Sequence, residues 1–172
     1  MNERMAVALA VIVIIVAVVG FILYEAPNVA SNSKNFGYSY SVIPSQTHSI
    51  QVTNTNGPIN VINWNNSQIV INGTVTSNGF GASPSDARLS QSDTNGAIVF
   101  SANQSSSFFF FGGYTVSINV YVPSGLNFAF LKVTTVNGEV KTSQLNSASV
   151  DASSVNGELS VACNCLETHL SS

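Results

Sequence analysis

Short runs of alternating apolar and polar residues fill the chain from about residue 48 onward. The clearest is Tyr114–Val122 (YTVSINVYV), where every second residue from Val116 is apolar. A period of two is typical of a β-strand with one buried face. The other runs are bounded by Asn-Gly or Asn-Asn pairs, which favour turns. They predict strands at Ser49–Thr53, Ile59–Trp64, Gln68–Thr76 and Ala97–Ala102.

The segment Leu126–Val161 repeats itself with a period of about 19 residues. Asn137-Gly138-Glu139 matches Asn156-Gly157-Glu158, and the flanking apolar positions match too. Such a fixed period is the signature of coils that stack on one another. Each unit is expected to hold two short strands. The predicted fold class is therefore an all-β β-solenoid, preceded by one transmembrane α-helix.

Within the repeat, the alternation predicts which side chains face the core. The inward set is Val140, Thr142, Ala148, Val150 and Ala152. Stacked coils would place three pairs in contact: Val140 with Leu159, Val150 with Leu131, and Val136 with Val155. The Asn-Gly pairs are expected to line up at one corner, because glycine accepts positive φ.

An uncharged apolar run, Met5–Tyr24, lies near the N-terminus. A helix of that length spans about 30 Å, the thickness of a hydrocarbon core. With Arg4 before it, the run predicts a single-pass anchor in the lipid bilayer and an extracellular C-terminal domain. A cleaved signal peptide and a prepilin-type leader are the alternatives. The predicted domains are 1–25 (anchor), 26–47 (Ser/Asn-rich linker) and 48–172 (β-solenoid).

Two segments interrupt the strand pattern. The stretch 78–93 is predicted to be a surface loop. Four consecutive phenylalanines, Phe108, Phe109, Phe110 and Phe111, cannot all face one side of a strand. They either cover an open end of the core or form an exposed contact tip for self-association or adhesion.

The pattern resembles the putative-adhesin β-solenoid family of bacterial and archaeal cell-surface proteins. The residues that carry the resemblance are Ile50–Val61, Val120–Leu126 and the two Val-Asn-Gly-Glu units. It covers about residues 49–170. The resemblance implies a stacked β-solenoid without established catalysis.

Charged residues make up only 8% of the chain, and the net charge is −3. Five Lys and Arg residues provide no basic patch, so the sequence predicts no nucleic-acid partner. Ser, Thr, Asn and Gln supply the polar surface instead. Three Asn-x-Ser/Thr sequons, at Asn65, Asn72 and Asn103, are candidate N-glycosylation sites.

Cys163 and Cys165 stand close together near the C-terminus, with one residue between them. In an extracellular protein they could form a disulfide. Buried free thiols are a second interpretation, and a metal site with His169 is a third, although that site would need a fourth ligand. His48 and His169 are both expected to be solvated.

The sequence predicts no enzyme, cofactor or metal. It lacks a nucleophile elbow, a phosphate-binding loop and a calcium loop. The first functional hypothesis is a membrane-anchored surface protein with an adhesion or envelope-structural role. The second is a subunit of a surface filament, pilin-like or assembled by strand exchange. The third is an envelope-sensing or scaffold partner of membrane proteins. Self-association, cell-surface proteins and glycans are the candidate partners.

Overall fold

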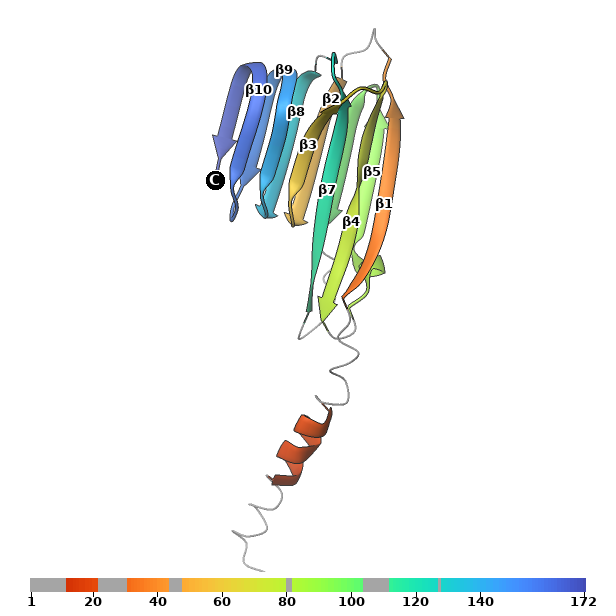
Figure 1. Cartoon of the computed structure of the whole chain (residues 1–172), viewed down its shortest axis with the longest axis vertical. Coiled ribbons are helices and arrows are strands. Elements are labelled where there is room, and N and C mark those ends of the chain that lie inside the picture. The colour runs from red at the N-terminus through yellow and green to blue at the C-terminus, as the bar shows by residue number, and fades with distance from the viewer. Residues whose placement is uncertain (1–11, 22–30, 44–47, 80–81, 104–111, 127) are drawn as a thin grey trace, which may run out of the picture.

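The computed structural model describes residues 12–21, 31–43, 48–79, 82–103, 112–126 and 128–172. Ten β-strands account for most of them (Figure 1). Their bounds are β1 Asn32–Ser41, β2 His48–Asn56, β3 Ile59–Trp64, β4 Gln68–Gly79, β5 Arg88–Thr94, β6 Ala97–Asn103, β7 Gly112–Pro123, β8 Phe128–Asn137, β9 Val140–Ser154 and β10 Leu159–Ser171. A 3-10 turn lies at Pro84–Asp86.

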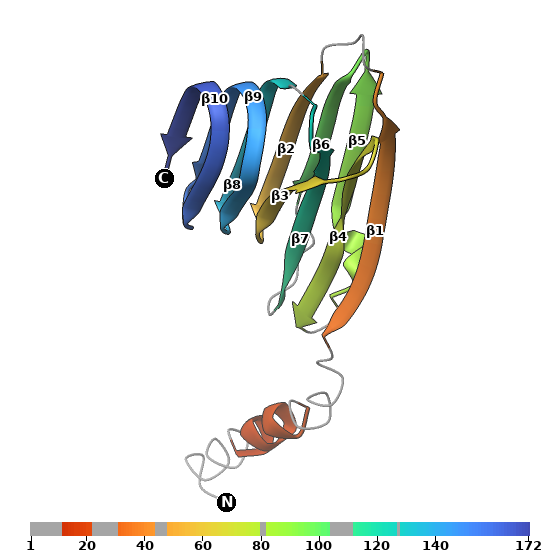
Figure 2. The same cartoon turned by 45° about the horizontal axis from the view of Figure 1, so that its top comes forward.

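The strands form a single sheet with the order β1-β4-β7-β3-β9-β8-β2-β6-β5, and β10 pairs with β9. The sheet folds over at β9. The first residues of β9, Val140–Thr142, pair with β3, whereas Ser147–Ser154 pair with β8. One layer therefore contains β3, β7, β4 and β1, and it faces a second layer of β8, β2, β6 and β5 (Figure 2).

The two end strands of the sheet come close to each other, so the curled sheet is nearly closed. The hydroxyl of Tyr40 on β1 donates a hydrogen bond to Gln91 Oε1 on β5 (3.0 Å). Phe36 on β1 stacks on Phe100 of β6, with ring centroids 5.5 Å apart. Side-chain contacts thus connect the two ends of the sheet.

The core lies between the two layers. Alternate residues of each strand point into it, as the period of two predicts. The fully buried large side chains include Ile50, Val52, Ile59, Val61, Ile69, Ile71, Ile98, Phe100, Ile118 and Leu131. The predicted inward face of β7 is confirmed, since Val116, Ile118, Val120 and Val122 are all buried.

The predicted β-solenoid is wrong. Three strand pairs, β1–β4, β4–β7 and β5–β6, are antiparallel, so these strands do not stack as successive parallel coils. The register of the sequence repeat is confirmed locally: Leu131 pairs with Val150 and Val140 with Leu159. The repeat relates only β8, β9 and β10. The strands before them follow no such period, and they complete a curled mixed sheet instead.

The predicted transmembrane helix is also wrong. The described helix covers residues 12–21, and residues 1–11 and 22–30 lie outside the described part of the chain. Among the residues that the structure describes, none forms a helix with both the length and the apolar character needed to cross a membrane.

Several predicted boundaries change as well. The linker prediction fails at Asn32–Ser41, which forms β1 and pairs with β4 along its whole length. The loop predicted at 78–93 contains most of β5. The two short strands predicted for each repeat are one continuous strand in β9, and Ala148 is exposed there instead of buried.

Candidate interaction surface

The two cysteines lie on β10 and are joined by a disulfide. Both sulfur atoms lie near the hydroxyl of Thr168, at 3.4 and 3.3 Å. The sulfurs are therefore not free thiols. His169 is exposed on the same strand, and no group of His, Cys, Asp or Glu in the described part of the chain could hold a metal ion.

The sequons differ in exposure. Asn65 is exposed between β3 and β4, and Asn103 is exposed at the end of β6. Asn72 is half-buried in β4, where Asn119 of β7 lies opposite it. The predicted contact tip, Phe108–Phe111, lies outside the described residues.

The prediction that His48 is solvated is wrong, because its side chain is only 2% exposed. It is the first inward residue of β2 and continues the buried face of Ile50 and Val52. Its Nε2 lies 3.1 Å from the carbonyl oxygen of Ile43. Its Nδ1 has no hydrogen-bond partner among the described residues. Strand alternation, read one residue further back, could have identified this position.

A row of six hydroxyl residues crosses the outer face of the second layer. Each lies opposite the next on the neighbouring strand, in the order Ser90, Ser101, Thr53, Thr134, Ser153 and Ser171. Neighbouring strands in a sheet are about 4.8 Å apart, so the hydroxyl groups are regularly spaced. The residues are half-buried or exposed. We call this set the hydroxyl row.

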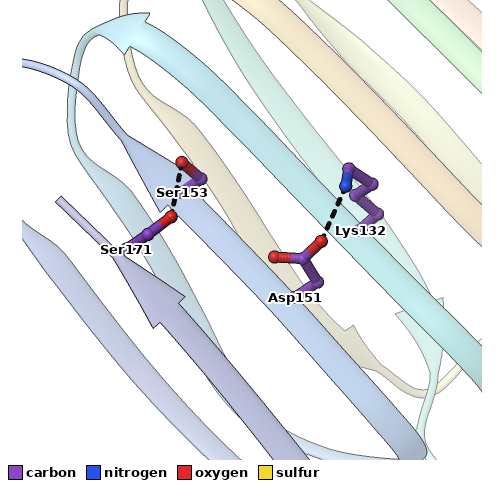
Figure 3. Close-up of polar contacts among 4 residues, drawn as sticks. All are labelled: Lys132, Asp151, Ser153 and Ser171. Atoms are coloured by element: carbon purple, nitrogen blue, oxygen red, sulfur yellow. Dashed lines mark hydrogen bonds and ion pairs between the residues drawn. The ribbon is translucent and has the colours of Figure 1, made fainter.

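An ion pair lies beside the hydroxyl row (Figure 3). Lys132 Nζ of β8 donates to Asp151 Oδ2 of β9 at 2.7 Å. Within the row, Ser171 Oγ donates to Ser153 Oγ at 2.9 Å. Lys132 and Asp151 are one repeat apart in the sequence, as are Thr134 and Ser153, so the repeat places both pairs. The ion pair neutralises two charges next to the hydroxyls.

The outer face of the first layer is also uncharged at its centre. Asn72, Asn119 and Asn60 lie in one row across β4, β7 and β3. Asn60 Nδ2 donates to Asn119 Oδ1 at 3.0 Å. The rings of Trp64 and Tyr121 lie near this row, with centroids 5.2 Å apart. Both faces of the domain therefore offer neutral hydrogen-bonding groups.

Sequence reasoning missed the hydroxyl row. The repeat could have paired Thr134 with Ser153, but Thr53 and Ser101 join the row only because β2 lies between β8 and β6. No spacing along the chain indicates that neighbour relationship.

β10 forms an open edge of the sheet. Among the described strands, it pairs only with β9. Two of its leucines are exposed, Leu166 at 89% and Leu170 at 50%. Leu159 and Val161 pack against the core but are only partly buried.

Comparison with known proteins finds no matching protein-family model and no curated protein of similar sequence. Among solved structures, the chain is similar to a putative cell adhesion protein from Clostridium sporogenes (12% identity, TM-score 0.43), covering 72% of this chain and 59% of that one. It is also similar to a putative adhesin from Parabacteroides distasonis (13% identity, TM-score 0.32), with coverages of 73% and 55%. A putative adhesin from Parabacteroides merdae (10% identity, TM-score 0.28) is covered over 77% of its length, and the match spans 80% of this chain.

The structural neighbours named above are described as one putative cell adhesion protein and two putative adhesins. The chain spans less than two thirds of the length of the first two. At these identities and TM-scores, the activity of those proteins is not transferred to this chain.

Proposed function

We propose that this protein is a non-catalytic adhesion protein of the cell surface that binds a neutral, hydroxyl-rich partner such as a polysaccharide. The observation that carries the proposal is the hydroxyl row across six strands. A hydroxyl group both donates and accepts hydrogen bonds, so the row can pair with sugar hydroxyls in either direction.

The charge distribution favours a neutral partner over a charged one. Only 8% of the residues are charged, and Lys132 and Asp151 neutralise each other beside the row. Salt screens attraction between exposed charges but has little effect on neutral hydrogen bonds. Binding should therefore persist when the salt concentration is raised from about 0.05 M to about 1 M.

The proposal is tested by binding of the full chain to an array of neutral polysaccharides. The variant carrying both Thr53→Val and Thr134→Val loses two central hydroxyls but keeps two β-branched side chains of similar shape. A neutral hydrogen bond contributes about 0.5–1.5 kcal/mol, so the double variant should bind about 10-fold more weakly or worse.

Thr115→Val is the matched control. Thr115 is half-buried on β7 in the other layer, so its replacement should leave binding unchanged. Failure to bind any neutral polysaccharide, or equal loss in the control, would contradict the proposal.

A further inference from the structure

We propose that β10 pairs antiparallel with β10 of a second copy of this chain, centred on Thr168, to form a two-fold symmetric dimer. This inference concerns self-association and does not depend on the hydroxyl row. It stands on the open edge of β10, its exposed leucines and the order of its charged groups.

β10 has few of the features that protect an edge strand. Natural edges are blunted by lysine, proline, bulges or short length. β10 is 13 residues long, contains neither Lys nor Pro, and pairs with β9 alone. Its one register shift lies between Val161 and Cys163. The part from Glu167 to Ser171 is in regular register with β9, which leaves its outer edge free for another strand.

Exposed apolar side chains flank this free edge. Leu166 is 89% exposed and Leu170 is 50% exposed. Leu170 lies opposite the buried Ala152, so it extends the core face of β9 to the rim of the sheet. A second copy laid against β10 would cover both leucines.

Self-complementarity selects the register. When Thr168 faces the partner's Thr168, Glu167 faces the partner's His169, and Leu166 faces the partner's Leu170. Two-fold symmetry makes the contact of Glu167 with the partner's His169, and that of Leu166 with the partner's Leu170, each occur twice. A register centred on Glu167 would place this residue opposite the partner's Glu167. A register centred on His169 would place this residue opposite the partner's His169. Opposite charges and apolar pairs directly across a ladder stabilise it, and like charges destabilise it.

The neighbouring strands support the same arrangement. Lys132, Asp151 and His169 occupy one row across β8, β9 and β10. With the partner's Glu167 next in that row, basic and acidic side chains alternate over four strands. The pairing therefore continues a charge pattern already present within one chain.

The other two edge strands are less accessible. β1 and β5 end the sheet on the far side, but they approach each other through Tyr40 and Gln91. A contact between β10 and β1 of another copy would not close on itself and would give open-ended chains. The β10–β10 contact predicts dimers only.

The test is sedimentation equilibrium of the full chain, in mild detergent because the apolar run Met5–Tyr24 could associate by itself. The unmodified chain should show a monomer–dimer equilibrium. Glu167→Lys should weaken the dimer about 10-fold, since both contacts between Glu167 and the partner's His169 are lost. His169→Lys should tighten it about 3-fold, because a permanent charge then faces Glu167.

The double variant distinguishes pairing from general destabilisation. In the Glu167→Lys background, His169→Lys should weaken the dimer, the reverse of its effect alone. Leu166→Asp should also dissociate the dimer without changing the unfolding temperature of the monomer, since the side chain is exposed there. Lys34→Glu, at an exposed position on β1, is the control and should change nothing.

Four results would overturn the inference. They are a chain that stays monomeric at the highest concentration reached, open-ended oligomers, an additive effect of the two lysine substitutions, and dissociation by Lys34→Glu.

Discussion

Gly157 packs directly on the carbonyl group of Gly138, so closely that a β-carbon on Gly157 would overlap that oxygen. Gly138 stands in the same relation to Gly57, and Gly57 to Val116. The Asn-Gly corners thus line up, as the repeat predicts, and Asn156 Nδ2 donates to Asn137 Oδ1 beside them at 2.8 Å.

The physical reason differs from the predicted one. Among the described glycines, positive φ occurs at Gly57, Gly79 and Gly96. Gly138 and Gly157 are therefore required for close approach of the backbones and not for a left-handed conformation.

Gly138→Ala should destabilise the domain by about 1–3 kcal/mol, the usual cost of forcing extra atoms into a packed site. Gly157→Ala should cost less, because β10 pairs only with β9 among the described strands and can move away. Chemical denaturation measures both. Gly125→Ala, where a β-carbon meets no atom within 4 Å, is the control. Equal stability of all three variants would contradict the close packing.

Val150→Asp should unfold the domain. Val150 is fully buried and pairs with Leu131, and an unpaired carboxylate in such a site costs about 4 kcal/mol or more. Val155→Asp is the matched control on the same stretch of chain, since Val155 is 64% exposed. Limited proteolysis should show rapid digestion of the first variant only. Equal resistance of the two would mean that Val150 is not in the core.

Replacing both Cys163 and Cys165 with serine should have a small effect. The disulfide closes a very short loop, because only Asn164 separates the two cysteines. A disulfide stabilises mainly by restricting the unfolded chain, so for such a loop the loss should be about 1.5 kcal/mol. Thermal unfolding of the oxidised, reduced and doubly substituted chains measures it. A loss as large as that of Val150→Asp would show that the sulfurs are essential to the packing of β10.

Stability should fall as the pH rises from 10 to 12. Burial, together with the neighbouring Tyr38 and Asp93, raises the pKa of Tyr40 to about 12. The unfolded chain releases this proton near pH 10, so the neutral tyrosine stabilises the fold fully below pH 10. That contribution is lost as the pH rises through the folded pKa.

Denaturant titrations at pH 9 and pH 12 test this prediction. Tyr40→Phe removes the hydroxyl and its hydrogen bond to Gln91, and it should flatten the pH dependence over this range. If the stability of the Tyr40→Phe variant fell between pH 9 and pH 12 as much as that of the unmodified chain, a group other than Tyr40 would cause the pH dependence.

Most strands were predictable because each carries its own pattern. Ile59–Trp64 matches β3 at both ends, and the repeat spacing correctly pairs Leu131 with Val150. β1 was missed because its Asn-, Ser- and Tyr-rich sequence lacks regular alternation of aliphatic residues. It is held in place by pairing with β4 along its whole length, which no local signal in the chain reveals.

The sequence predicted the chemical character of the candidate surface but not its place in the fold. A low charge content and many Ser, Thr and Asn residues indicated a neutral polar surface. The hydroxyl row depends on β2 lying between β6 and β8, and the open edge depends on β10 pairing only with β9 among the described strands. The first is a relationship between strands distant in sequence, and the second depends on which strands neighbour β10 in the folded sheet.

The sequence by itself determined the all-β class, the buried face of most strands and the local stacking of β8, β9 and β10, because these follow from the strand alternation and from the repeat. Only the tertiary structure decided that the sheet is mixed and curled and that six hydroxyls lie in one row. The reason is physical: period and propensity act between residues close along the chain, whereas strand order is chosen by the packing of the whole core.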